Sequence, residues 1–184
     1  MGIAMGAGNH WVDCPDGKSS VPSAEGIVSF FELGCTYNYQ ALHAPLAFKS
    51  SLFYCYRKSS FSSHYLRLPV GVDLMVGKRF AFVAGAGFYF AYMIAHSDLP
   101  DDIELEESVL RSHLGGYLNA GVKFPLSSKG AVSILFHSDS DLTEIYSVED
   151  FSPGGARFFD PCFGKEYYPE FRITKKIFAD NKDN

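Results

Sequence analysis

The sequence predicts an all-β protein, an eight-stranded antiparallel up-and-down transmembrane β-barrel. Three observations lead to this fold class. Apolar side chains recur at every second residue along most of the chain, which is the period of a β-strand. No segment keeps a helical period, and no apolar run approaches the ~20 residues that a membrane helix needs. Aromatic residues make up 16% of the 184 residues and charged residues only 20%, which is typical of strands with one wholly apolar face.

The segment 64–76 (HYLRLPVGVDLMV) shows this pattern most clearly. Its apolar face carries a large aliphatic residue at every second position, namely Leu66, Leu68, Val70, Val72, Leu74 and Val76. The opposite face includes Arg67 and Asp73. At ~3.3–3.4 Å per residue and a tilt near ~45°, the apolar face covers roughly 25 Å, the height of the lipid-facing band of an outer-membrane barrel. We therefore expect the aliphatic face to meet lipid and the charged face to meet the barrel interior.

Eight segments of this kind follow one another along the chain. They span residues 1–11, 26–39, 46–57, 64–76, 80–95, 113–126, 131–136 and 165–178. A tight turn at Gly77–Lys78 and another within 127–130 alternate with long connectors, and such alternation is typical of barrels whose short turns face the periplasm. We expect one barrel domain over residues 1–178, followed by a polar tail over 179–184. The long connectors would present residues 9–25, 96–111 and 143–163 outside the cell.

A soluble lipocalin-like carrier of a small apolar ligand is the alternative, because it uses the same alternation with the apolar face turned inward. Its cavity would be lined by Leu66, Leu68, Val70, Phe88 and Phe90. The second face of the segment 80–95 favours the membrane barrel instead. That face consists of Ala81, Val83, Gly85, Gly87, Tyr89, Ala91 and Met93, which would be a poor surface toward water.

Composition excludes several function classes. The formal net charge of −5 argues against a nucleic-acid partner. No cofactor motif is present, so we expect no cofactor. The chain does not start with a charged stretch followed by an apolar one, so an outer-membrane location requires that an export signal was removed ahead of Met1.

Three stretches resemble the outer-membrane β-barrel domain family (PorT-like) of Bacteroidota. They are YLRLPVGVDLMVGKRFAFVAGAGFYFAYM (65–93), GGYLNAGVKFPLSSKGAVSILF (115–136) and, more loosely, MGIAMGAGNHW (1–11). The resemblance implies an eight-stranded barrel in the outer membrane with an architecture like that of OmpA and OmpX. Most members of that family have no assigned activity. From the barrel itself, we expect outer-membrane lipid around it, and an envelope or extracellular protein partner through the long connectors. Such proteins usually end on an aromatic residue that is recognised during insertion; here Phe178 is the candidate, although ADNKDN follows it.

Charged residues on the inward faces are the first candidate site. The expected inward set is Glu32, Lys49, Arg67, Asp73, Lys123, Glu170 and Arg172. Buried charges must pair, and if the connector after residue 57 is centred near Phe61, Lys49 lies opposite Asp73. We expect a salt-bridged plug with no passage; the alternative is a small pore or proton path.

Metal sites are not expected. An acidic stretch holds Asp98, Asp101, Asp102, Glu104, Glu106 and Glu107. It lacks the spacing of a preformed calcium loop, so a solvated loop is the better interpretation. His64, His96 and His113 fall near one rim of neighbouring strands, but alternation turns His64 and His96 toward lipid and His113 toward the interior. Their rings therefore cannot converge on zinc.

Enzyme activity is also not expected. The run HSDSD at 137–141, followed by Glu144, invites comparison with the lipid A deacylases of the outer membrane. It does not reproduce their His-x-Ser-Asn spacing. The adjacent His137 and Ser138 also point to opposite faces of a strand, so the histidine cannot serve as the base that a nucleophilic serine needs.

The four cysteines are Cys14, Cys35, Cys55 and Cys162. Cys35 would face lipid and Cys55 the interior, so they cannot bridge. Cys14 and Cys162 fall in long connectors next to the first and last strands, which are neighbours in a closed barrel. A loop disulfide between them in an oxidising compartment, or two free thiols, are both open.

Overall fold

The computed structural model describes residues 1–13, 28–40, 44–58, 62–77, 80–97, 112–127, 130–143, 146–151 and 157–175. These residues form nine strands: β1 (Gly2–Asp13), β2 (Val28–Gln40), β3 (Leu46–Lys58), β4 (Ser62–Val76), β5 (Ala81–Ser97), β6 (Ser112–Ser127), β7 (Gly130–Asp141), β8 (Tyr146–Phe151) and β9 (Arg157–Lys175). No helix among the described residues is long and apolar enough to cross a membrane.

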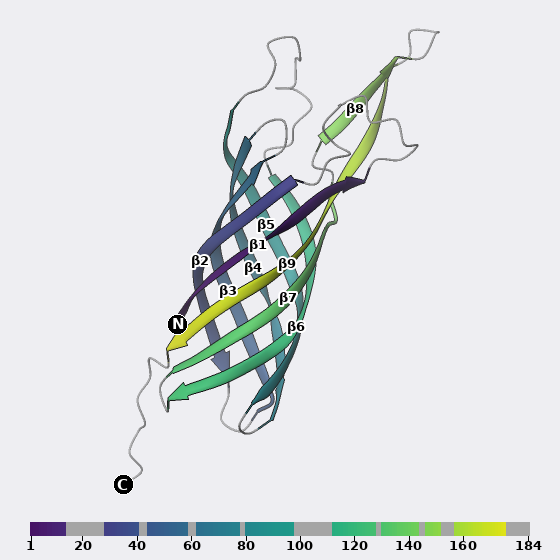
Figure 1. Ribbon diagram of the computed structural model, residues 1–184. Coiled ribbons are helices and arrows are strands. Elements are labelled where there is room, and N and C mark those ends of the chain that lie inside the picture. Colours follow the sequence, from purple (N-terminus) through teal and green to yellow (C-terminus); the bar gives the residue numbers. More distant parts are fainter. Residues whose placement is uncertain are drawn as a thin grey trace.

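Eight of the strands close into an antiparallel barrel (Figure 1). Each of β1 to β7 pairs with the next strand around the barrel, β9 follows β7, and β9 pairs back onto β1 from Gly2↔Thr174 to Asp13↔Phe163. The backbone N–H of Lys175 donates to the carbonyl of Met1 at 2.8 Å, which completes the seam. Closure leaves no unpaired sheet edge around the barrel, and it confirms the predicted fold class.

β8 is the strand that the sequence analysis missed. Among the described residues, it pairs only with residues 157–162 of β9, and it lies beyond the barrel at the end opposite the two termini (Figure 1). Part of the expected long connector 143–163 is therefore a two-stranded extension. This strand has only six residues, and its alternation includes Tyr146 and Val148 but is followed by Glu149 and Asp150. Such a short alternating pattern cannot be distinguished from a connector in the sequence.

Two connectors differ from expectation. The two-residue turn at Gly77–Lys78 is wrong, because Val76 pairs with Phe82 and five residues separate them. Gly77 has a φ of 135°, a conformation that suits glycine. The connector between β3 and β4 is, by contrast, shorter than the six residues (58–63) left between the expected segments. Only residues 59–61 separate Lys58 from Ser62.

Alternation along the strands separates two surfaces. Inward side chains are buried, and the outward ones form a broad apolar belt in which Phe88 and Phe82 are 69% exposed and Leu118 is 63% exposed. Charged and polar residues such as Glu32, at 0% exposed, lie inside. A soluble protein buries most of its large apolar side chains and exposes its charges. The distribution here is the opposite, and it matches that of a barrel in lipid.

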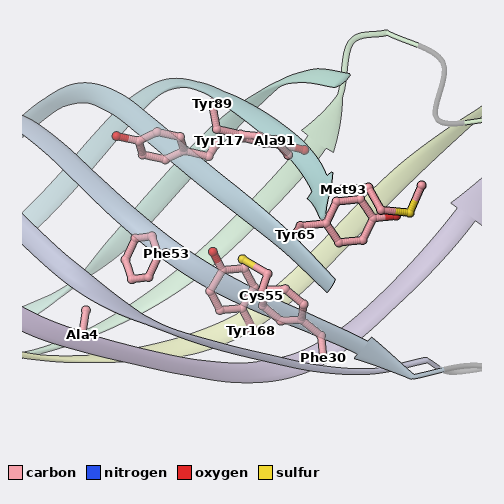
Figure 2. Close-up of a cluster of buried hydrophobic side chains, with 10 residues drawn as sticks. All are labelled: Ala4, Phe30, Phe53, Cys55, Tyr65, Tyr89, Ala91, Met93, Tyr117 and Tyr168. Atoms are coloured by element: carbon pink, nitrogen blue, oxygen red, sulfur yellow. The ribbon is translucent and has the colours of Figure 1, made fainter. Parts of the chain in front are cut away.

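The soluble-carrier alternative is wrong on this point. Leu66, Leu68, Val70, Phe88 and Phe90, which would line its cavity, are all exposed on the outer surface. An apolar ligand would need them inside. The interior is filled instead, partly by rings that Figure 2 shows converging from several strands. Phe30 and Tyr168 lie there with their ring centroids 4.9 Å apart.

Candidate functional site

The inward charges form the most polar part of the described structure. Of the expected inward set, six side chains are buried to at least 97%, namely Glu32, Lys49, Arg67, Asp73, Glu170 and Arg172. Lys123 is half-buried near the end of the barrel where the termini lie, and its Nζ lies 3.7 Å from the sulfur of Met75. Alternation places these residues inside because each occupies a position of the same parity as its strand's buried neighbours.

Arg67 of β4 is the centre of the larger group. Its guanidinium pairs with Asp139, lies 3.2 Å from a carboxylate oxygen of Glu166 and lies 3.6 Å from one of Glu32. It also donates to the Tyr168 hydroxyl at 3.2 Å and sits 3.9 Å from the centre of the Tyr89 ring. A guanidinium has five N–H donors in a fixed fork, so one arginine can bridge carboxylates from β2, β7 and β9.

A second group lies nearer the termini and is built around Glu170 of β9. Arg172 donates to Glu170 at 2.8 Å and to Asp73 at 3.4 Å, and the Lys49 ammonium lies 3.9 Å from Glu170. The predicted contact between Lys49 and Asp73 is wrong. Lys49 pairs in register with Gly71, and Asp73 with Ala47, so the β3–β4 connector is centred on Ser60 and each partner is displaced by two residues.

Several members of this interior were missed by sequence reasoning. The residues are Arg57, His137, Asp139, Asp141 and Glu166, all of them buried, whereas His113 is buried as expected. Arg57 pairs with Glu166 at 2.5 Å, and the Tyr89 hydroxyl donates to Asp141 at 2.5 Å. Parity could have found them, because Asp139 and Asp141 share the face of His137, and Glu166 shares the face of Glu170.

A small cavity lies between the second group and the end of the barrel at the termini. Its volume is about 10 Å³, and its lining includes Asn38, Asp73, Lys123 and Arg172. That is about the space of one water molecule. Side chains thus fill the described interior, as expected for a barrel of eight strands.

Gly115 of β6 is needed for this filling, because the Tyr89 ring lies directly over it and a Cβ there would collide with the ring carbons. We expect Gly115→Ala to lower the free energy of unfolding by about 1–3 kcal/mol, the usual cost of overpacking. The adjacent Gly116 faces outward, with its nearest neighbour at 3.8 Å. Gly116→Ala is the matched control, and it should change stability by less than about 0.5 kcal/mol. Urea unfolding in detergent micelles measures both; equal losses would contradict the packing argument.

His137 does not approach Ser138 as a base would. Its ring is stacked between Tyr168 and Tyr117, with centroid distances of 5.0 and 5.9 Å. Its Nε2 lies 3.3 Å from Glu170, inside the barrel. Ser138 has the outward parity of Phe136 and is half-buried. A Ser–His pair on the barrel wall is therefore not formed by these two residues.

The histidines do not make a metal site in the described part of the chain. His64 is on the outer wall, where the Tyr54 hydroxyl lies 2.5 Å from its Nδ1. His113 is buried, with its Nε2 3.4 Å from Asp141, and the side chain of His96 lies outside the described residues. No group of three or more His, Cys, Asp or Glu side chains able to hold a metal occurs among those described.

Most of the remaining candidate residues lie outside the part of the chain that the structure describes. The acidic stretch 98–107, Cys14, Phe178 and the tail lie outside the described residues, and so does the side chain of Cys162. Of the other two cysteines, Cys35 is exposed on the outer wall and Cys55 is buried inside. The disulfide between Cys14 and Cys162 stays a prediction.

Solved structures with the same architecture give the fold a context. The outer-membrane enzyme PagL matches with a TM-score of 0.56 and 13% identity, over 92% of this chain and 97% of that one. The outer-membrane protein OprG from Pseudomonas aeruginosa matches with a TM-score of 0.53 and 11% identity, over 97% and 96%. The chain has the fold of a small outer-membrane barrel. At this identity the likeness concerns the fold alone.

Sequence comparisons add no relative. No protein-family model matches the chain, and no curated protein matches it. The PorT-like resemblance therefore stays a prediction.

Proposed function

We propose that this protein is an outer-membrane β-barrel without catalytic activity, which stabilises the envelope or presents its loops to an outside partner. The observation that supports this most is the inverted surface: large apolar side chains face outward around the barrel, while the charges are buried inside. Such a belt is stable only in contact with hydrocarbon. The loops available to a partner are those at the end opposite the termini, within 9–25, 96–111 and 143–163.

The location is tested by fractionation and by gel migration. We expect the protein in the detergent-soluble membrane fraction, and we expect the unheated sample to migrate differently from the boiled one, because the closed barrel resists unfolding. Recovery of folded protein in plain buffer without detergent would refute the proposal.

A plugged interior should not conduct ions. Arg67 and Arg172 each hold carboxylates from across the barrel, and the described cavity has room for about one water. We expect no discrete single-channel steps in planar bilayers at physiological salt. Regular steps would contradict the plug and would favour the small pore.

Absence of catalysis is a separate part of the proposal. It is supported by the inward position of His137, which leaves Ser138 without that base on the outer wall. Hydrolysis of lipid substrates by the purified barrel, lost in His137→Ala, would refute it without affecting the location.

A further inference from the structure

The outward-facing side chains that the structure describes carry charge of one sign. Among those that the structure describes, and leaving tyrosine and cysteine aside, the ionisable residues are Lys58, His64, Lys165 and Lys175. The carboxylates of the described side chains all belong to the buried set. Among the described side chains, the outer wall therefore offers only basic groups, and they lie near the two ends of the apolar belt rather than in its middle.

Lys58 and His64 lie together at the end of the barrel opposite the termini. Lys58 is the last residue of β3 and pairs with Ser62, the first of β4; His64 is two residues further along β4 on the same face. Such diagonal neighbours are roughly 7–8 Å apart, within reach of a lysine side chain. Lys58 is exposed and His64 half-buried.

Two tyrosines complete this surface, which we call the Lys58–His64 patch (Tyr54, Tyr56, Lys58 and His64). The ring of Tyr56 lies 5.1 Å from that of His64, and the ring of Tyr54 lies 5.8 Å from it. Tyrosine is enriched where hydrocarbon meets headgroups. The two tyrosines therefore indicate that the patch lies close to the height of the lipid phosphates.

Hydrogen bonding determines what His64 can offer. When the Tyr54 hydroxyl donates to Nδ1, at 2.5 Å, the proton of the neutral ring is on Nε2, which is then a donor. Lys58 adds an ammonium with three donors. Two donors side by side, with no described carboxylate on the same surface, suit an anion that accepts several hydrogen bonds.

The connector at this point is short. Only residues 59–61 join β3 to β4, whereas 14 residues (14–27) separate β1 from β2 and 14 (98–111) separate β5 from β6. A three-residue connector spans little beyond the two strand ends that it joins. The patch therefore lies at a strand pair that has no long connector of its own.

We propose that the Lys58–His64 patch binds the phosphate group of an anionic membrane lipid, with Tyr54 and Tyr56 against the lipid below its headgroup. The proposal rests on the membrane location proposed above. An anionic lipid is favoured over a zwitterionic one, because the ammonium of a zwitterionic headgroup would be repelled by Lys58. One lysine near an anionic lipid surface contributes enough to change lipid retention roughly five-fold.

The test is native mass spectrometry of the full chain in detergent, titrated with phosphatidylglycerol or phosphatidylcholine of the same acyl chains. We expect the wild type to retain phosphatidylglycerol preferentially, and Lys58→Gln combined with His64→Gln to reduce that preference roughly five-fold or more. Lys175→Gln, which removes one charge at the other end of the same wall, is the matched control and should leave the preference unchanged.

The inference would be overturned by equal retention of the two lipids by the wild type, by an unchanged preference in the double variant, or by an equal loss in the control. A loss of selectivity on adding glycerol phosphate at the concentration of the lipid would also overturn it, in favour of a soluble phosphate. Folding of each variant is checked first by the gel shift on heating. If the wild-type chain does not fold in detergent, the proposed location is refuted. If the wild-type barrel folds but shows no lipid preference, only this inference is refuted.

Discussion

Replacing Arg67 with methionine is expected to lower the free energy of unfolding by about 3–5 kcal/mol, the usual cost of leaving a buried ionic partner uncompensated. Arg67 is 2% exposed, and its guanidinium is shared by Glu32, Asp139 and Glu166. Methionine keeps an unbranched apolar stem but removes the guanidinium and all of its donors. Three buried carboxylates would then face one another with less compensation.

The measurement is urea unfolding in detergent or in lipid vesicles. The control is Lys123→Met, which removes a positive charge from a half-buried site whose described polar contact is the Met75 sulfur at 3.7 Å; it should cost less than about 1 kcal/mol. If Arg67→Met cost no more than this control, the Arg67 group would not be what holds the interior together.

An arginine placed on the outer wall should cost stability according to its depth in the membrane. Val70 lies near the middle of β4 and Val76 at its end, and they are 43% and 57% exposed. We expect Val70→Arg to cost about 2–4 kcal/mol and Val76→Arg about 0–1 kcal/mol, because a charge at the bilayer midplane is far from water while one near the interface is not.

This pair is measured by reversible unfolding from phospholipid vesicles, where the barrel is surrounded by hydrocarbon. Both valines face outward on one strand, so each substitution is the control of the other. In a barrel surrounded by water, both arginines would be solvated and neither would cost much. Equal, small effects at the two positions would therefore contradict the lipid-facing assignment of the wall.

The faces of the strands could be predicted from the sequence because they depend only on local geometry. A strand alternates its side chains with a period of two, so the aliphatic run Leu66 to Val76 and the inward pair Arg67 and Asp73 follow from one segment. The same parity would have placed Asp139, Asp141 and Glu166 inside. Asp139 and Asp141 were missed because the region after Phe136 reads as a connector, whereas Glu166 was overlooked at the start of the recognised segment 165–178.

Contacts between strands could not be predicted with the same certainty. The pairing of two strands depends on where the connector is centred, and a centre at Phe61 instead of Ser60 displaces every partner by two residues without changing any face. This is why Lys49 and Asp73 were placed inside as observed, while their contact was wrong.

By itself, the sequence determined which solvent each side chain meets, because alternation is a property of a single strand. Only the tertiary structure decided which charges neutralise one another. Arg67 meets Glu166, and Arg172 meets Asp73, across 99 residues of chain in both cases. Such partners are brought together when β9 pairs with β1 and the barrel closes, and no single segment carries that information.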